Sequence, residues 1–492
     1  MKKGVFLAIL SGLLLSFSFP SCNLSILAWF GFLPLFFRLR NKSGLQDFLL
    51  AYICGVIFWG FTIYWLVHVT LLGTVILILY LSMYFGFFGL IFSFACLLPA
   101  ACCLFFIPSS WVLLEYARSH LLTGFPWALI GFSQYKNLAV IQLADISGVW
   151  GISFLVVFFN AALYLIWRGK MKSRISLICG AILILSLAYG FYKLNRGSTC
   201  RTDKATVRVA VIQGNIPQYL KWDISARDFI LNRYKELTFE SAKNKPSLII
   251  WPEASVPGIL GEDEAVFEQV FSLARALNID LLAGAVSRTR GNYFNSALFI
   301  DKSGEPVEIY HKLHLVPFGE FIPLKKTFPF LQTIAPIGDI QPGEEYTIFD
   351  KPAKFGVLIC FEDLFPELSR RFVRNGAEFL VNITNDAWYK ETSAAAQHFS
   401  ASVFRAVENR VYLARAANTG ISGFVDPWGR IISPVRDTGG KEIFVRGFSS
   451  AEICLPAGRS FYNRYGDIFI LLCLLFDICV VIIRKLGVRE YS

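Results

Sequence analysis

Seven long apolar runs fill the first 195 residues of the chain, and an eighth lies close to its end. The runs cover residues 4–19, 24–38, 47–67, 70–98, 100–117, 147–167, 175–193 and 467–483. A helix needs roughly 20 apolar residues to cross a bilayer, and most of the runs come close to that length. The chain has 17% charged residues, whereas soluble domains have about 25%. We therefore expect a membrane protein with seven N-terminal spans and one C-terminal span.

The composition changes after the seventh run, because residues 200–458 contain charges, prolines and strand patterns but no span. Strand patterns such as 206–215 alternate with helical patterns such as 264–277, which is typical of a layered α/β domain. We expect three parts, which are a transmembrane helical bundle over 1–195, the α/β domain over 200–458 and a transmembrane helix over 467–485.

The net charge of +11 comes largely from basic residues at the ends of the apolar runs. These residues are Lys2, Lys3, Arg38, Arg40, Lys42, Arg168, Lys170, Lys172, Arg174, Arg484 and Lys485. Basic loops stay on the cytoplasmic side of a membrane, so the pattern predicts an orientation and argues against a nucleic-acid groove. With all these residues inside, an odd number of spans places the α/β domain outside the cytoplasmic membrane.

Three chemically reactive side chains follow predicted strands of the α/β domain, where such sheets place their sites. Glu253 follows the run "LIIWP", Lys312 comes after the strand near 295–301, and Cys360 ends the run "GVLI". A thiol nucleophile needs a base to take its proton, and Glu253 would be that base. The oxyanion of acyl transfer needs donors, which the Lys312 ammonium and the Phe361 N–H would supply.

Two further carboxylates, Glu320 and Glu362, would hold Lys312 or assist proton transfer.

Each of these residues also has a purely structural interpretation. A lone cysteine on a strand usually belongs to the core, Glu253 would cap a helix, and Lys312 would be a solvated charge. His311 and His314 would form a metal or base pair only with further ligands, and none stands at ligand spacing. No C-x-x-C pair is present, so we expect neither a metal site nor a soluble cofactor.

Three motifs resemble the signatures of the carbon–nitrogen hydrolase, or nitrilase, superfamily. They are "WPEAS" at 251–255, "HKLHLVPFGEFIP" at 311–323 and "GVLICFED" at 356–363. The resemblance covers roughly residues 205–450 and implies a nitrilase-like α-β-β-α sandwich with a Glu–Lys–Cys triad. It implies that Glu253 is the base, Lys312 the oxyanion stabiliser and Cys360 the acylated nucleophile.

The segments 115–134 and 213–223, together with the seven-plus-one plan, look like those of bacterial apolipoprotein N-acyltransferases. The resemblance implies a multi-pass protein of the inner membrane with its catalytic domain on the periplasmic side. It implies that a fatty acyl chain moves from a phospholipid, through a cysteine thioester, to the N-terminal diacylglyceryl-cysteine of an apolipoprotein. It also implies that Glu320 and Glu362 are essential supports and that Trp222 lies on a substrate-gating loop.

Two details of the sequence qualify this resemblance. The family usually has tyrosine after the catalytic cysteine, whereas this chain has Phe361, which keeps the ring and lacks the hydroxyl. Cys200 and Cys454 flank the α/β domain, and a disulfide between them is a further hypothesis.

Two other classes of function remain open from the sequence. A membrane-tethered amidase or nitrilase would use the same triad with water as acceptor, but it would not require eight spans. A non-enzymatic transporter or receptor with an outer binding domain would require functional charges inside the spans. Asp477 is the clearest such charge.

Overall fold

The computed structural model describes residues 2–20, 22–39, 44–171, 173–197, 205–221, 223–322, 340–455 and 458–487. The chain divides into two compact units. The first, a helical unit, comprises residues 1–198, 392–400 and 464–492, and the second, an α/β unit, comprises residues 199–391 and 401–463.

Among the described residues, five helices of the helical unit are long and apolar enough to cross a membrane. They are α3 (Gly44–Thr62), α4 (Leu71–Ala95), α5 (Ala100–His120), α7 (Ala144–Trp167) and α8 (Ser173–Arg196). The predicted C-terminal span forms α15 (Ile468–Gly487), and the first apolar run forms α1 (Lys2–Phe17). The membrane character is thus confirmed, whereas the count of seven plus one stays a prediction.

The second apolar run, 24–38, does not form one continuous helix. It is divided between η1 (Ser25–Trp29) and α2 (Leu33–Arg38), with Pro34 in the first turn of α2. Proline fits the first turn of a helix but interrupts a helix interior. The run therefore forms a short apolar segment, Ser25–Arg38, that consists of two short elements.

Gln397, in the short segment 392–400, ties together loops of the helical unit. Its Oε1 accepts hydrogen bonds from Trp127 Nε1 at 2.8 Å and Trp65 Nε1 at 3.2 Å. Its Nε2 donates to the carbonyl oxygens of Pro20 at 2.8 Å and Thr62 at 2.9 Å. One amide side chain thus satisfies two indole donors and two main-chain acceptors that are far apart in the sequence.

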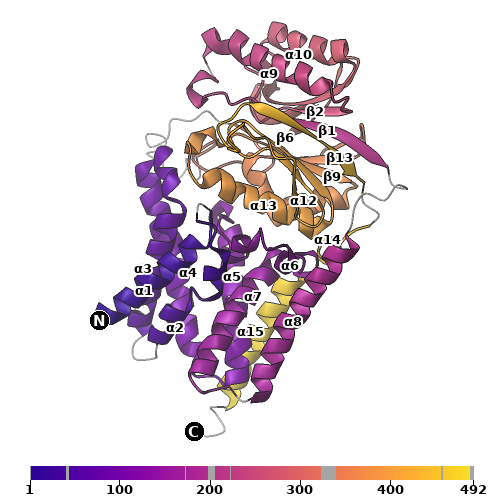
Figure 1. Cartoon of the computed structure of the whole chain (residues 1–492). Helices are drawn as coiled ribbons and strands as arrows, with labels where there is room; N and C mark the ends of the chain where they lie inside the picture. Colours follow the sequence, from indigo (N-terminus) through magenta and orange to yellow (C-terminus); the bar gives the residue numbers. More distant parts are fainter. Residues whose placement is uncertain are drawn as a thin grey trace. The chain divides into compact units, whose positions relative to one another are not determined.

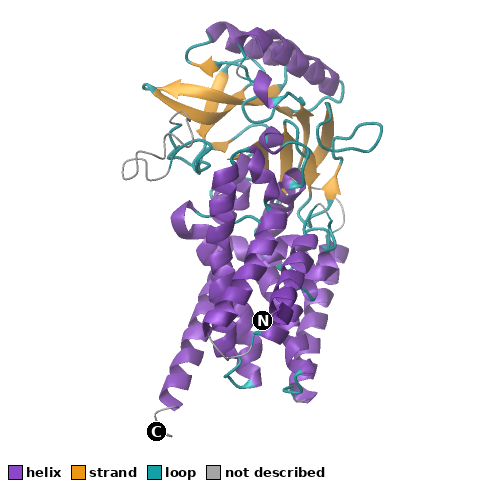
Figure 2. Cartoon of the chain, turned by 90° about the vertical axis from the view of Figure 1, so that its left-hand side faces the viewer, coloured by secondary structure: helices purple, strands orange, loops and turns teal. Residues whose placement is uncertain are grey.

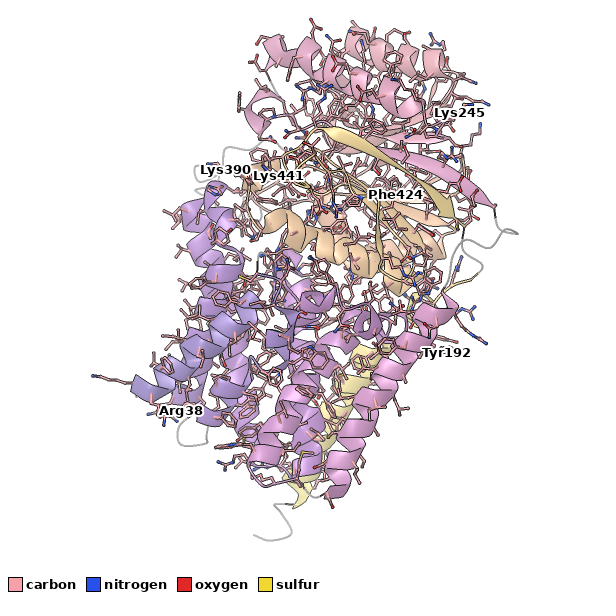
Figure 3. The ribbon with its side chains drawn as sticks, in the orientation of Figure 1. Arg38, Tyr192, Lys245, Lys390, Phe424 and Lys441 are labelled. Atoms are coloured by element: carbon pink, nitrogen blue, oxygen red, sulfur yellow. The ribbon has the colours of Figure 1, made fainter. Side chains whose placement is uncertain are left out.

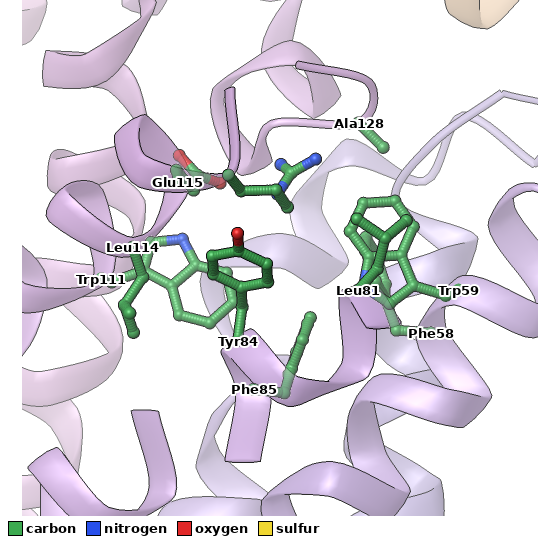
Figure 4. Close-up of a pocket in the computed structure, with 10 residues that line it drawn as sticks. Phe58, Trp59, Leu81, Tyr84, Phe85, Trp111, Leu114, Glu115 and Ala128 are labelled. Atoms are coloured by element: carbon green, nitrogen blue, oxygen red, sulfur yellow. The ribbon is translucent and has the colours of Figure 1, made fainter. Parts of the chain in front are cut away.

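A small pocket in the helical unit is lined by two buried charged side chains, Glu115 and Arg118 (Figure 4). Glu115 accepts a hydrogen bond from Ile130 N at 2.7 Å, and Arg118 donates to the Trp127 carbonyl at 2.9 Å. The Arg118 guanidinium also lies over the Trp59 ring, 4.8 Å from its centroid. Both charges of α5 therefore hold the main chain of the loop that follows this helix.

Asp477, the clearest charge in a predicted span, is hydrogen-bonded within the helical unit. Its carboxylate accepts hydrogen bonds from the hydroxyls of Ser109 and Ser110. These contacts join α15 to α5 and give the aspartate a structural role in helix packing.

All the strands in the described part of the chain belong to the α/β unit, and they form two sheets (Figure 2). The first sheet has the order β13 (Gly447–Cys454), β1 (Thr206–Gln213), β2 (Leu248–Ile250), β4 (Asp280–Thr289), β5 (Asn292–Ile300) and β6 (Pro306–His311), with β3 (Ile259–Leu260) paired to β4. The second has the order β12 (Ile431–Ile432), β11 (Gly423–Val425), β10 (Tyr412–Ala417), β9 (Phe379–Thr384), β8 (Phe355–Ile359) and β7 (Ile348–Phe349).

Helices cover the outer faces of the two sheets, which contact each other through β1 with β10 and β5 with β8. The first sheet packs against α9 (Arg227–Ala242) and α10 (Glu264–Leu277), which lie side by side in Figure 1. The second packs against α12 (Pro366–Arg374). This arrangement confirms the predicted nitrilase-like α/β architecture.

The central strands of each sheet are parallel. In the first sheet β2 pairs with β1 and with β4, and in the second β9 pairs with β8 and with β10. Every residue of β9 and β10 is buried, as expected for parallel strands covered on both faces. Parallel pairing brings the carboxyl ends of neighbouring strands to one edge, and there the chain can place polar side chains.

The disulfide hypothesis is tested only in part. Cys454 is disulfide-bonded, but Cys200 lies outside the described residues, so the pairing of these two stays a prediction.

Candidate active site

The three predicted catalytic residues come together in the α/β unit. Glu253 follows β2, Lys312 follows β6 and Cys360 follows β8. Lys312 Nζ lies 3.7 Å from Glu253 Oε1. Both charges act on the Cys360 thiol. The negative charge of Glu253 raises the pKa of the thiol, and the positive charge of Lys312 lowers it. The fold therefore assembles a thiol, a carboxylate and an ammonium from both sheets.

Cys360 sits on a strained turn between β8 and the short helix η7 (Cys360–Leu364). Its φ is +52°, a left-handed conformation that costs a residue with a Cβ about 1–2 kcal/mol. Such strain persists where the surrounding structure holds it, often at active sites. The thiol is buried, and burial, reinforced by Glu253, raises its pKa far above the ordinary value. The Cys360 thiol is therefore protonated at rest, and a reaction as a thiolate would need a base.

Glu253 occupies a loop that packs closely on β4. The N–H groups of Ser255 and Val256 both donate to the Gly284 carbonyl, at 2.8 and 3.1 Å. A Cβ at Gly284 would overlap the Pro252 carbonyl and lie 2.6 Å from Glu253 Cα. Glycine is thus required at this position for the loop to approach β4 and present the carboxylate.

Lys312 is 1% exposed and is held by carboxylates. Its Nζ lies 2.9 Å from Glu320 Oε2 and 3.0 Å from Glu320 Oε1. Glu320 Oε2 also accepts a hydrogen bond from Val316 N at 2.8 Å. Burial alone would lower the pKa of Lys312, but the charges of Glu320 and Glu253 raise it above the ordinary value. Lys312 therefore stays a cation at the site.

Asn295, on β5, is a site residue that the sequence analysis missed. Its Nδ2 donates to Glu253 Oε1 at 2.8 Å and to Glu320 Oε1 at 2.7 Å. It thus bridges the two carboxylates that flank Lys312. A buried asparagine within the apolar pattern "NSALFI" was the available signal, because buried amides require partners.

Glu362 forms a second polar centre two residues after Cys360. Its carboxylate accepts hydrogen bonds from Leu313 N and His314 N at 2.7 and 3.0 Å, and from Ile359 N at 2.7 Å. Tyr310, another residue missed from the sequence, donates its hydroxyl at 2.9 Å. Glu362 therefore joins the segment that carries Lys312 to the strand that carries Cys360.

Phe361 has both a packed ring and an N–H available for chemistry. The ring lies 5.1 Å from the Phe365 ring and 5.9 Å from the His314 ring, measured between centroids. Its N–H belongs to the first turn of η7, where helical N–H groups lack an intrahelical acceptor. The N–H is thus a suitable donor for an oxyanion formed at Cys360.

A buried hydrogen-bond network next to Cys360 was also missed from the sequence. Asn382, on β9, donates to the carbonyls of Leu358 at 3.1 Å and Cys360 at 3.2 Å. Arg415, on β10, donates to Asn382 Oδ1 at 2.5 Å and to Asp363 at 2.8 Å. These bonds fix the main chain at Leu358 and Cys360 and so hold the strained turn. An arginine inside the apolar strand "YLARAA" was the signal, since a buried charge needs partners.

The remaining predicted residues contribute little to this centre. His311 Nδ1 lies 2.8 Å from Ser296 Oγ, and its ring stacks on Phe294. His314 packs on Phe365, 3.9 Å between ring centroids. The residues that the structure describes contain no group of three His, Cys, Asp or Glu side chains arranged for a metal. Trp222 lies outside the described residues, so its gating role stays a prediction.

Comparison with known proteins agrees with both parts of the chain. Residues 208–453 match the carbon–nitrogen hydrolase family model, and residues 11–162 match that of the apolipoprotein N-acyltransferase N-terminal domain. The apolipoprotein N-acyltransferase of Geobacter metallireducens is 38% identical over 96% of this chain and 93% of its own. Those of Rickettsia prowazekii and Chlorobaculum tepidum are 33% and 28% identical, over 80% and 96% of this chain and 82% and 95% of their own.

The fold and the site define a carbon–nitrogen hydrolase unit joined to a unit of membrane-type helices. Residues 11–162 match the model of the apolipoprotein N-acyltransferase N-terminal domain, and apolipoprotein N-acyltransferases match nearly the full length of the chain. These two matches identify one family within the carbon–nitrogen hydrolases. The chain belongs to the apolipoprotein N-acyltransferase family.

Proposed function

We propose that the protein transfers a fatty acyl chain from a membrane phospholipid, through a thioester on Cys360, to an apolipoprotein. The acceptor is the α-amino group of the N-terminal diacylglyceryl-cysteine, and the product is a triacylated lipoprotein. This reaction is the last step of lipoprotein maturation. The observation that carries the proposal is the buried Glu253–Lys312–Cys360 cluster in a chain that also has membrane-type helices.

In the first half-reaction, the Cys360 sulfur attacks the acyl ester carbonyl while Glu253 takes the thiol proton. The Lys312 ammonium and the Phe361 N–H stabilise the tetrahedral oxyanion. Collapse breaks the carbon–oxygen bond, and Glu253 returns the proton to the hydroxyl of the leaving lysophospholipid. The acyl group remains on Cys360 as a thioester.

In the second half-reaction, the acceptor amine attacks the thioester carbonyl, and Glu253 receives the ammonium proton. Breaking the carbon–sulfur bond releases the amide product, and Cys360 regains its proton. Glu320 and Asn295 support this exchange because both contact Lys312 or Glu253 directly. The cycle uses only side chains and main-chain donors of this chain.

The membrane helices explain how such a site would receive a lipid. Each acyl CH₂ group costs about 0.8 kcal/mol to move into water, so a site at the membrane surface avoids a large desorption cost. We propose seven N-terminal spans and one C-terminal span in the inner membrane. The basic residues at the span ends then lie in the cytoplasm, and the α/β unit lies on the periplasmic side.

A membrane-tethered amidase with the same triad is the alternative within the enzymes. A transporter or receptor is the alternative of another class, but Asp477 is hydrogen-bonded by Ser109 and Ser110 and gives that class no support.

Intact mass measurement tests the proposal. The purified protein is incubated with phospholipid vesicles beside Cys360→Ala and Glu253→Gln. We expect an added acyl mass on the parent protein, none on Cys360→Ala, and formation slowed roughly 10²- to 10⁴-fold in Glu253→Gln. A diacylglyceryl-cysteine peptide should discharge the adduct. Discharge by water at the same rate without peptide would assign the hydrolase instead, and no adduct on a folded parent protein would reject the nucleophile.

A further inference from the structure

Lys221 is a buried lysine of the α/β unit with no part in the mechanism above. It follows η5 (Gln218–Leu220) and is 6% exposed. Its Nζ donates a hydrogen bond to the main-chain carbonyl of Glu253 at 2.9 Å. A buried ammonium is costly unless it is paired and hydrogen-bonded, so its presence at this position calls for a reason.

The contacts of Lys221 differ from those of Lys312. Lys312 pairs with two carboxylates, whereas no carboxylate among the described residues lies at ion-pair distance from Lys221. Burial lowers the pKa of Lys221 to about 8, while the charges of Glu253 and Cys360 oppose this. Lys221 is therefore a cation whose charge interacts with both Glu253 and Cys360. Its hydrogen-bond acceptor is the main-chain carbonyl of Glu253.

Lys221 also ends a segment that is anchored to other parts of the site. Ile216 exchanges hydrogen bonds with the Asn418 side chain at 2.9 and 2.8 Å. Gln218 accepts from Asn385 Nδ2 at 2.7 Å. The third anchor is Lys221 on Glu253. The segment is thus held by residues that follow β9 and β10 and by the catalytic base itself.

Charge balance shows why a second cation would matter. Glu253 and Glu320 bring two negative charges to the site, and Lys312 brings one positive charge. With Lys312 alone, this group of side chains carries an excess negative charge, which disfavours an anion at Cys360. A second ammonium removes that excess.

We propose that Lys221 is a positioning residue of acyl transfer, which anchors the main chain of Glu253 and supplies the second positive charge of the active site. The inference rests on the proposed function for its role in acyl transfer, but its effect on Cys360 reactivity does not. Loss of the charge lowers the reactivity of the thiol, whatever the acyl donor is.

The test compares Lys221→Met, Lys221→Gln and Lys221→Arg, with Lys245→Met as the control. Lys245 is an exposed lysine of the same unit (Figure 3). Two rates are measured on the full-length protein in detergent. The first is alkylation of Cys360 by iodoacetamide, followed by mass spectrometry of the peptide that contains it. The second is formation of the acyl-enzyme from phospholipid.

We expect Lys221→Met and Lys221→Gln to lower both rates about tenfold to a hundredfold, with Lys221→Arg recovering most of the loss and Lys245→Met like the parent. Glutamine retains a donor for the Glu253 carbonyl without the charge, so it separates anchoring from electrostatics and serves if the methionine variant does not fold. Rates within twofold of the parent in a folded Lys221→Gln protein would overturn the role of the charge. Equal losses in Lys221→Gln and Lys221→Arg would also overturn it.

The alkylation arm keeps this inference separate from the proposed function. If the parent protein acquires no acyl group, the proposed function fails. The alkylation rates of the same variants still decide the role of Lys221, because iodoacetamide needs no acyl donor.

Discussion

Replacing Asn382 with leucine should release the strained turn that contains Cys360. Asn382 is fully buried and donates to the carbonyls of Leu358 and Cys360, and it accepts from Arg415. A neutral hydrogen bond contributes about 1 kcal/mol and one to a charged group about 1.5–3 kcal/mol. Leucine has a similar size but makes none of these bonds.

The expected loss in the free energy of unfolding is therefore about 3–5 kcal/mol. For a domain of 150–250 residues this corresponds to a decrease in Tm of roughly 6–20 °C. The effect on chemistry should be larger than stability alone explains, because the left-handed conformation of Cys360 loses its support. A displacement of the reacting atom by about 1 Å can cost on the order of 10²-fold in rate.

The assay combines thermal unfolding in detergent with the time course of acyl-enzyme formation by intact mass. The matched control is Asn409→Leu, because Asn409 is equally buried and also makes three hydrogen bonds, to Arg405, Ser369 and Asn463. We expect both variants to lose stability and only Asn382→Leu to lose acylation below its unfolding temperature. Acylation by folded Asn382→Leu at the rate of the control would refute the argument that Asn382 holds the turn.

Three further changes test other parts of the structure. Asn295→Ala removes a donor from both Glu253 and Glu320, so acyl-enzyme formation should slow about tenfold to a hundredfold; an unchanged time course would contradict the bridging role. Burial raises the pKa of Glu362 to about 7, so its contribution to stability is complete below its unfolded pKa of about 4.5 and is lost as pH rises through 7. The difference in Tm between the parent and Glu362→Gln should therefore decrease as the pH is raised from about 4.5 to about 7. A Tm difference that stays constant over this pH range would argue against the pKa shift. Gln397→Leu removes five side-chain hydrogen bonds and should cost roughly 2–5 kcal/mol. The loss should be seen as a lower Tm and changed tryptophan fluorescence, and parent-like values of both would contradict its role.

Local patterns in the sequence account for the parts of this protein that depend on neighbouring residues. The apolar runs predicted the membrane-type helices, because crossing a bilayer requires a minimum apolar length. Glu253, Lys312 and Cys360 stood out because each follows a strand pattern, and parallel strands bring their carboxyl ends to one edge. Glu320 and Glu362 were found because they lie within the same short motifs.

Other residues of the site were decided only by the tertiary structure. Asn295, Asn382, Arg415 and Lys221 lie within segments whose patterns read as ordinary strand or loop. Their importance comes from partners 22 to 52 residues away, such as Cys360 for Asn382 and Asp363 for Arg415. Strand pattern does not specify which buried amide will face which carboxylate, since that depends on the pairing and stacking of the two sheets.

The sequence by itself thus determined the kind of chain, the division into apolar and α/β parts, and the three reactive side chains. These features follow from composition and from periodicity within a few residues. The tertiary structure decided how the thiol, the base and the ammonium are held, because buried polar groups must find partners wherever folding brings them. The left-handed turn at Cys360 and the second lysine beside Glu253 are the clearest results of that requirement.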